Sequence, residues 1–354
     1  MSRMLETVLA GLEGADPGAM ERARRQWDSL AKPLGSLGMI EDMIVRIAGS
    51  AGTEKISLDE RCLVVFCADN GVVKRGVSQS DHTVTAAVAK ALAEGTSTAN
   101  ILARQVGCRV LAVDIGMKEH PPFAGLDDRC VRRGTGDSTC ERAMTREETL
   151  TAVETGIRLA GEQKEKGCRF LLAGEMGIGN TTTSAAAACA LLGKEPAAMT
   201  GRGAGLDTEG FERKIRVIET ALAFHRPDRN DPIDILSKTG GADIAALTGL
   251  CLGGAFYRIP VLLDGVITLT AAALAVTLCL PVKDHLLASH VSAEPAAAML
   301  LEKIGLEAPV RAMIRLGEGG GALMTLPLLD AALALYSSGH TFGQLGIEAY
   351  QKLK

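Results

Sequence analysis

Aromatic residues are scarce in this 354-residue chain, at 3% of the total with one Trp and three Tyr. Proteins that bind single-stranded nucleic acid stack bases on aromatic rings and attract the backbone with a basic surface. This chain has a formal net charge of −4 and lacks both features. We therefore expect no nucleic-acid partner.

Metal-ligand spacing is also missing, although the chain contains nine cysteines. These cysteines are scattered and odd in number, no C-x-x-C pair occurs, and the six histidines form no H-x-x-x-H pair. Such a pattern is typical of reduced thiols in a cytoplasmic protein, and it argues against a disulfide framework or a zinc cluster. We expect a cytoplasmic location and no bound metal.

The most apolar stretch of the chain falls short of a comfortable membrane span. The most apolar stretch, 266–282, is interrupted by threonines and follows Asp264, so we expect a buried helix there. The N-terminal segment carries acidic residues and no long apolar core, which argues against a signal peptide. We expect no membrane partner.

Glycine is abundant, with 40 residues, and many glycines follow short apolar runs. These runs cover 62–71, 109–117, 169–180 and 259–268, and they alternate with helical stretches at 84–92, 98–106, 181–192 and 268–280. Unbroken apolar runs that alternate with helices are typical of a parallel sheet covered on both faces. We predict an α/β fold with a large, parallel-sheet, Rossmann-like domain. Residues 5–30, a second segment ending near Ala48, and an apolar segment from about Ala322 are predicted to be helical and to form a smaller annex.

The strongest candidate site is the segment from Gly174 to Thr183, where a strand runs through a glycine-rich turn into a helix. Backbone N–H groups at such a helix start, together with the helix dipole, can bind a phosphate. The segment has neither the lysine of a nucleoside-triphosphatase loop nor the full G-x-G-x-x-G of a dinucleotide site. The alternative is a tight turn whose helix is capped by Asn180 and the threonines.

Other candidates are weaker. The loop 201–207, with Lys214 on the next predicted helix, is either the other side of a phosphate clamp or an ordinary loop. Glu318 lies among glycines and is either a general base or an exposed residue in a turn. Asp264 ends a strand and either positions a substrate hydroxyl or starts a turn. The segment 289–295 is polar, and its pattern alone favours an ordinary surface loop.

Taken in order, these segments resemble one family, the nicotinate-nucleotide:dimethylbenzimidazole phosphoribosyltransferases. The shared motifs span nearly the whole chain, namely 32–38, 68–72, 76–78, 113–116, 134–135, 174–183, 201–203, 240–244, 263–265, 292–295 and 316–319. Each motif is weak alone, and their co-occurrence in order is specific.

The resemblance implies a large α/β domain, about 61–319, and a small helical domain built from about 1–60 plus 320–354. It implies transfer of the phosphoribosyl group of nicotinate mononucleotide to an aromatic base, giving an α-ribotide phosphate and nicotinate, without a cofactor. It also implies a homodimer, or a heterodimer with a paralogue in some relatives.

The resemblance also assigns roles to residues. Glu318 matches the carboxylate that removes a proton from the attacking base. The phosphate- and ribose-binding positions match Glu175, Gly177, Ile178, Gly179, Asn180, Gly203, Lys214, Asp264 and Ser292. The pocket for the aromatic base matches Ser78, Ser80, His82 and Leu316.

The departures from the family pattern lie near the base pocket. His82 stands where a Gln is usual, 95–100 differ from the usual sequence, and Gly320-Gly321 replaces a commoner Thr-Gly. The acceptor is therefore dimethylbenzimidazole or, as in related heteromeric enzymes, phenol or p-cresol. An inactive nucleotide-binding partner subunit and a dinucleotide-dependent oxidoreductase are the remaining alternatives.

Overall fold

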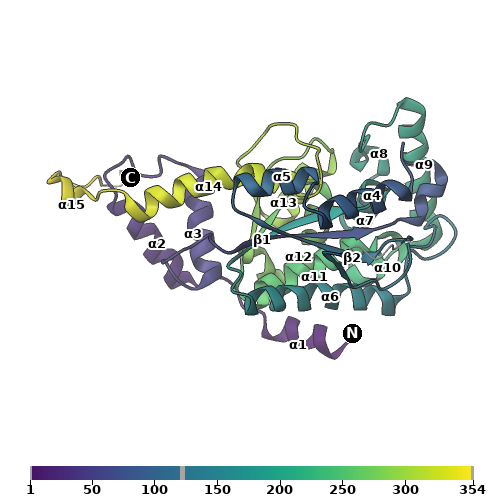
Figure 1. Cartoon of the computed structure of the whole chain (residues 1–354), viewed down its shortest axis with the longest axis horizontal. Helices are drawn as coiled ribbons and strands as arrows, with labels where there is room; N and C mark the ends of the chain where they lie inside the picture. The colour runs from purple at the N-terminus through teal and green to yellow at the C-terminus, as the bar shows by residue number, and fades with distance from the viewer. Residues whose placement is uncertain (1, 120–123, 352–354) are drawn as a thin grey trace.

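The computed structural model describes residues 2–119 and 124–351 and centres on one parallel sheet (Figure 1). The sheet has the strand order β3-β2-β1-β4-β5-β6. Its strands are β1 (Arg61–Ala68), β2 (Arg109–Gly116), β3 (Leu126–Asp128), β4 (Phe170–Met176), β5 (Val261–Leu263) and β6 (Leu286–Ala288). Every paired neighbour is parallel, which confirms the predicted Rossmann-like α/β class.

The strands alternate their side chains between two hydrophobic layers. Val64 and Phe66 pack into one layer, whereas Leu63 and Val65 pack into the other, and all four are fully buried. Because both faces are covered, the strands read as unbroken apolar runs in the sequence. The four predicted runs all contain strands, although β5 stops after three residues. The edge strands β3 and β6 were not predicted, since three residues leave almost no pattern.

Most of the layer that contains Val64 comes from α1 (Arg3–Gly11), α6 (Arg146–Glu165), α7 (Asn180–Leu192), α10 (Pro232–Thr239), α11 (Ala242–Phe256), α12 (Val266–Leu278) and α13 (Ala296–Ile304). The opposite layer contains α2 (Pro17–Ser29), α3 (Met39–Ala51), α4 (His82–Ala93), α5 (Thr98–Gln105) and α14 (Gly320–Ser338). The shorter or peripheral elements are α8 (Pro196–Met199), α9 (Thr208–His225), α15 (Phe342–Leu345), η1 (Gly71–Arg75) and η2 (Leu280–His285).

The predicted helical segment 5–30 is interrupted in the structure by residues 12–16. The Asp16 side chain accepts a hydrogen bond from the N–H of Ala19 at 3.0 Å, and Pro17 occupies the first turn of α2. Both features favour a new helix start at this point. As a result, α1 packs against α11, while α2 packs against α3.

Both chain ends contribute to the helical part that projects beyond the sheet in Figure 1. There α14 contacts α3, and the rings of Trp27 and Tyr336 lie 5.1 Å apart. The helices α2, α3 and α14 share one continuous hydrophobic layer with the sheet. The exact division into 1–60 plus 320–354 and 61–319 stays a prediction, and residues 1 and 352–354 lie outside the described residues.

Within the described residues, α14 alone is long and apolar enough to cross a membrane by length and composition. Half of its apolar window is buried inside the protein. The stretch 266–282 instead begins with α12, whose residues are almost all buried, as predicted.

Candidate active site

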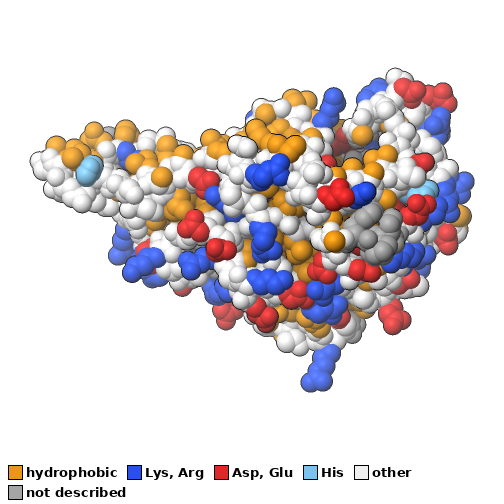
Figure 2. Space-filling view, in the orientation of Figure 1, with side chains coloured by type: hydrophobic (Ala, Val, Ile, Leu, Met, Phe, Trp, Pro, Cys, Tyr) orange, Lys and Arg blue, Asp and Glu red, His pale blue; other side chains and the backbone are white. Residues whose placement is uncertain are grey.

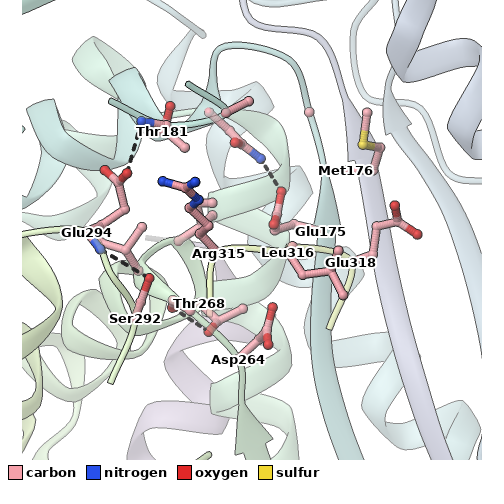
Figure 3. A pocket seen from close by; sticks show the side chains of 18 of the residues that line it. Glu175, Met176, Thr181, Asp264, Thr268, Ser292, Glu294, Arg315, Leu316 and Glu318 are labelled. Atoms are coloured by element: carbon pink, nitrogen blue, oxygen red, sulfur yellow. Dashed lines mark hydrogen bonds between the residues drawn. The ribbon is translucent and has the colours of Figure 1, made fainter. Parts of the chain in front are cut away.

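The candidate site lies at the carboxyl ends of the strands, where the strand order reverses. In a sheet of this order, β1 and β4 are neighbours whose connections run to opposite sides, so a crevice opens beyond their ends. A cavity of about 290 Å³ occurs here, and Figure 3 shows its lining side chains. Glu175 and Met176 from β4 and Asp264 from the end of β5 form one wall.

The glycine-rich turn leads from β4 into α7. Gly179 adopts a left-handed conformation with φ of +91°, and no side chain caps the helix start, so the alternative of an Asn180 cap is wrong. Instead, the Asn180 amide nitrogen donates to Glu175 and, at 3.0 Å, to Oδ2 of Asp243. Burial raises the pKa of Glu175 well above its usual range and that of Asp243 to about 6. The turn is therefore held by a buried network of two carboxyls and an amide.

One corner of the cavity collects groups that can bind an oxyanion. Lys214 on α9 is completely buried, and its Nζ donates to Oγ1 of Thr181 at 2.9 Å and to the carbonyl of Gly201 at 3.2 Å. Burial lowers the pKa of Lys214 to about 8, against the opposing charge of Glu294. We call Thr181, Gly203, Lys214 and Ser292 the oxyanion corner.

A protein carboxylate already occupies part of this oxyanion corner. The N–H of Gly203 donates to Oε1 of Glu294 at 3.0 Å, and this acidic side chain also lines the cavity. The role of Gly203 in binding a phosphate stays a prediction, because the acceptor seen for its N–H is this protein carboxylate.

Glu318 approaches the cavity from the loop before α14. Its φ of +56° is unusual for a residue with a side chain, and its N–H donates to the carbonyl of Glu175 at 3.2 Å. Its Oε2 accepts from the N–H of Ala99 at 3.4 Å, at the start of α5. Burial raises the pKa of Glu318, while the hydrogen bonds from Ala99 and Ser97 oppose this shift. A carboxylate with a raised pKa is suited to accept a proton near neutral pH.

Asp264 fixes the start of α14. Its Oδ1 accepts from the N–H of Ala322 at 3.0 Å, and the side chain is almost completely buried. Burial raises the pKa of Asp264 to about 7, although backbone donors around it favour the charged form. Asp264 therefore holds the segment that carries Glu318.

Most of the predicted site residues meet in this cavity. They are Glu175, Gly177, Ile178, Asn180, Gly203, Asp264, Ser292, Leu316 and Glu318. Lys214 lies behind the wall, next to Thr181. Ser78 and Gly179 line a smaller adjoining cavity of about 80 Å³.

Two predicted residues of the base pocket lie elsewhere. Ser80 and His82 line neither of these two cavities, and Nε2 of His82 lies 3.1 Å from Oε1 of Glu119. Their assignment to the base pocket stays a prediction.

Several lining residues were not assigned to the site from the sequence. They include Thr181, Thr268, His290, Glu294 and Arg315. Thr181 and Glu294 lie inside motifs that the sequence analysis identified, and Arg315 directly precedes the motif at Leu316. Proximity to those motifs is the only signal that points to them.

The comparisons with known proteins agree with this architecture. A family model described as "Phosphoribosyltransferase" matches residues 12–347. The nicotinate-nucleotide–dimethylbenzimidazole phosphoribosyltransferase of Ruminiclostridium cellulolyticum is 42% identical over 349 residues, covering 99% of both chains. That of Roseiflexus sp. is 41% identical over 348 residues, covering 98% of both.

A crystal structure of the nicotinate-nucleotide–dimethylbenzimidazole phosphoribosyltransferase from Thermus thermophilus has the same fold. It superposes with a TM-score of 0.87 at 36% identity and covers 94% of this chain and 99% of the other. The fold and the family match define the class of this protein as an α/β phosphoribosyltransferase. Within that class, the chain belongs to the nicotinate-nucleotide:dimethylbenzimidazole phosphoribosyltransferase family.

Proposed function

We propose that this protein transfers the phosphoribosyl group of nicotinate mononucleotide to a nitrogen of 5,6-dimethylbenzimidazole. The products are an α-ribotide phosphate and nicotinate, for the assembly of the cobamide nucleotide loop. One observation carries the proposal: a single cavity is lined by oxyanion-binding groups on one wall and by Glu318 on another. The relatives described above are named for the same two substrates.

The proposed reaction exchanges one bond at the anomeric carbon for another. The bond from this carbon to the pyridinium nitrogen breaks, and its electron pair neutralises the departing ring. A benzimidazole nitrogen attacks from the opposite face and forms the new bond, so the configuration changes from β to α. The other ring nitrogen of the acceptor then loses its proton to the Glu318 carboxylate.

The protein contributes positioning and fixed charges to this exchange. The oxyanion corner, which includes the Gly203 N–H and Ser292, would hold the 5′-phosphate close to the positive end of α7. Buried dipoles that need no reorganisation lower the barrier for a reaction in which charge moves. Asp264 and Glu175 hold the backbone on either side of Glu318.

The names of the relatives support a benzimidazole acceptor, and no contact of the described residues favours phenol or p-cresol. The test is to incubate the purified chain with nicotinate mononucleotide and each acceptor in turn, and to measure nicotinate release. Release that depends on dimethylbenzimidazole supports the proposal. Release with the phenols only, or no release with any acceptor, contradicts it.

We further propose a homodimer that forms through the exposed side of α14. Met324 and Leu328, one turn apart on this helix, are 56% and 44% exposed, and Ile101 on the contacting helix α5 is 51% exposed. Figure 2 shows hydrophobic side chains gathered along this edge of the molecule. A second copy would cover this apolar stripe.

We also propose that the protein is cytoplasmic. All nine cysteines are free, and six of them are buried. Thiols persist in this form in a reducing compartment.

A further inference from the structure

The cavity has an unusual charge balance for a site that would receive a phosphorylated substrate. Four carboxyl side chains line it, from Glu175, Asp264, Glu294 and Glu318. Among the described lining residues, Arg315 is the one lysine or arginine. A phosphate monoester adds a charge of roughly −1.5 to −2 at pH 7, which the carboxyls that are ionised in this wall would repel without a cation close by.

Lys214 alone does not provide enough positive charge to balance the phosphate. It is completely buried behind Thr181, and two of its three donors are used on Thr181 and Gly201. Its pKa is lowered to about 8 by burial, so part of its charge is lost in mildly alkaline solution. The neighbouring N–H of Gly203 is held by Glu294.

Arg315 is anchored on both sides by main-chain hydrogen bonds. On one side, the N–H of Ala293 donates to the carbonyl of Ile314 at 3.2 Å; on the other, Glu318 donates to the carbonyl of Glu175 at 3.2 Å. The segment with Arg315 therefore bridges the two walls of the cavity. Its position is set by the backbone and not by a partner for its side chain.

The side chain of Arg315 extends from this bridge into the cavity. Figure 3 shows its guanidinium group pointing toward Thr181 and lying between Glu294 and Glu175. No hydrogen bond or ion pair joins it to another residue within 2–119 or 124–351, and the residue is exposed at the mouth. An arginine fork that faces an oxyanion site without a protein partner is suited to bind phosphate oxygens in pairs.

We propose that Arg315 is a substrate-binding residue that holds the 5′-phosphate from the solvent side, opposite Lys214. The inference rests on the proposed function, because it takes nicotinate mononucleotide as the ligand. Glu294 lines the same cavity, so the guanidinium charge offsets the repulsion between this carboxylate and the incoming phosphate. Arg315 thereby makes an acidic cavity selective for a phosphorylated nucleotide.

The test compares Arg315→Gln with Arg311→Gln, a matched control in the same exposed segment but outside the cavity lining. Loss of a charge-assisted pair predicts a KM for nicotinate mononucleotide raised about 10- to 100-fold in Arg315→Gln, with a smaller change in kcat. Arg315→Lys should recover part of the loss, and Arg311→Gln should match the wild type. Equal melting temperatures of the variants exclude a folding defect.

A second arm identifies the group that Arg315 binds. With nicotinate riboside, which lacks the phosphate, the wild type and Arg315→Gln should have the same KM. A penalty that persists with the riboside but disappears with nicotinamide mononucleotide would mean that Arg315 binds the ring carboxylate, and it would overturn the proposal. An unchanged KM for nicotinate mononucleotide would also overturn it.

Direct binding separates this inference from the proposed function. Calorimetry with inorganic phosphate and with nicotinate mononucleotide needs no turnover. Tight binding without transfer to any acceptor would refute the proposed function, while about 10-fold or greater weakening in Arg315→Gln would still support the role of Arg315. Equal binding by both proteins would refute that role even if the transfer is confirmed.

Discussion

The main-chain N–H of Glu318 donates to the carbonyl oxygen of Glu175 across 3.2 Å, which ties the loop before α14 to the end of β4. The approach is this close because Gly174 has no side chain: a Cβ there would lie 3.2 Å from the carbonyl carbon of Glu318. Two carboxyl-bearing residues that are far apart in the sequence are thus held on one cavity wall. The proposed chemistry depends on this attachment.

The pH dependence of turnover should report the carboxyl group of Glu318. Because burial raises its pKa, the base form is lost at a higher pH than for an exposed glutamate. We expect log kcat to rise with pH with a slope of one and to level off only above pH 4.5, the ordinary pKa of a glutamate. In Glu318→Gln the residual kcat should not show this rise with pH. A rise of the same size in this variant would assign the titration to another group.

The KM for nicotinate mononucleotide should depend on the protonation of Lys214. Burial lowers the pKa of this ammonium group to about 8, so its charge is lost as the pH rises through that value. The substrate phosphate is already a dianion above pH 7 and contributes no change there. We expect KM to rise between pH 7 and pH 9.5 in the wild type. Lys214→Met should have a high KM that stays constant over this range, and a flat wild-type profile would contradict the assignment.

The packing of α6 against α11 depends on Gly249. A Cβ at this position would meet the main-chain carbonyl of Val153 on α6. Alanine is otherwise favoured in a helix, so any loss of stability in Gly249→Ala reflects this contact. We expect a decrease of about 1–3 kcal/mol in the free energy of unfolding, measured by denaturant titration. Gly343→Ala, which meets only Thr341 at 4.0 Å, should unfold like the wild type.

The proposed dimer should depend on the apolar stripe of α14. We expect the double variant Met324→Glu/Leu328→Lys to be monomeric in analytical ultracentrifugation, because charged groups would be buried at the interface. The new pair is spaced i, i+4 with the acid first, an arrangement that supports the helix itself. Phe224→Glu, at a 58% exposed position on α9, should remain dimeric. A dimeric double variant would place the interface elsewhere.

The sequence predicted the central strands well because they are buried on both faces and therefore form unbroken apolar runs. The run at 62–71 and the glycine turn after 169–176 could be recognised without any structure. By contrast, β3 and β6 are three residues long and carry no distinct pattern. The break between α1 and α2 was signalled by Asp16-Pro17 but was not predicted.

The site was predicted less completely, because its contacts are long-range. No local pattern places Asn180 between Glu175 and Asp243, or Lys214 against Thr181. The role of Glu318 came from the family resemblance, since a glutamate among glycines is ambiguous alone. Arg315 was missed because one arginine in a loop has no spacing or periodicity to identify it.

The most direct test of the central claim compares two acceptors in the wild type and in Glu318→Gln. Dimethylbenzimidazole must lose a proton after attack, whereas its N-methyl derivative, 1,5,6-trimethylbenzimidazole, has no ring N–H to lose. If Glu318 is the base, Glu318→Gln should be slower by about 10²- to 10⁴-fold with the first acceptor and nearly equal to the wild type with the second. An equal loss with both acceptors, or no loss with dimethylbenzimidazole, would contradict a proton-accepting role for Glu318.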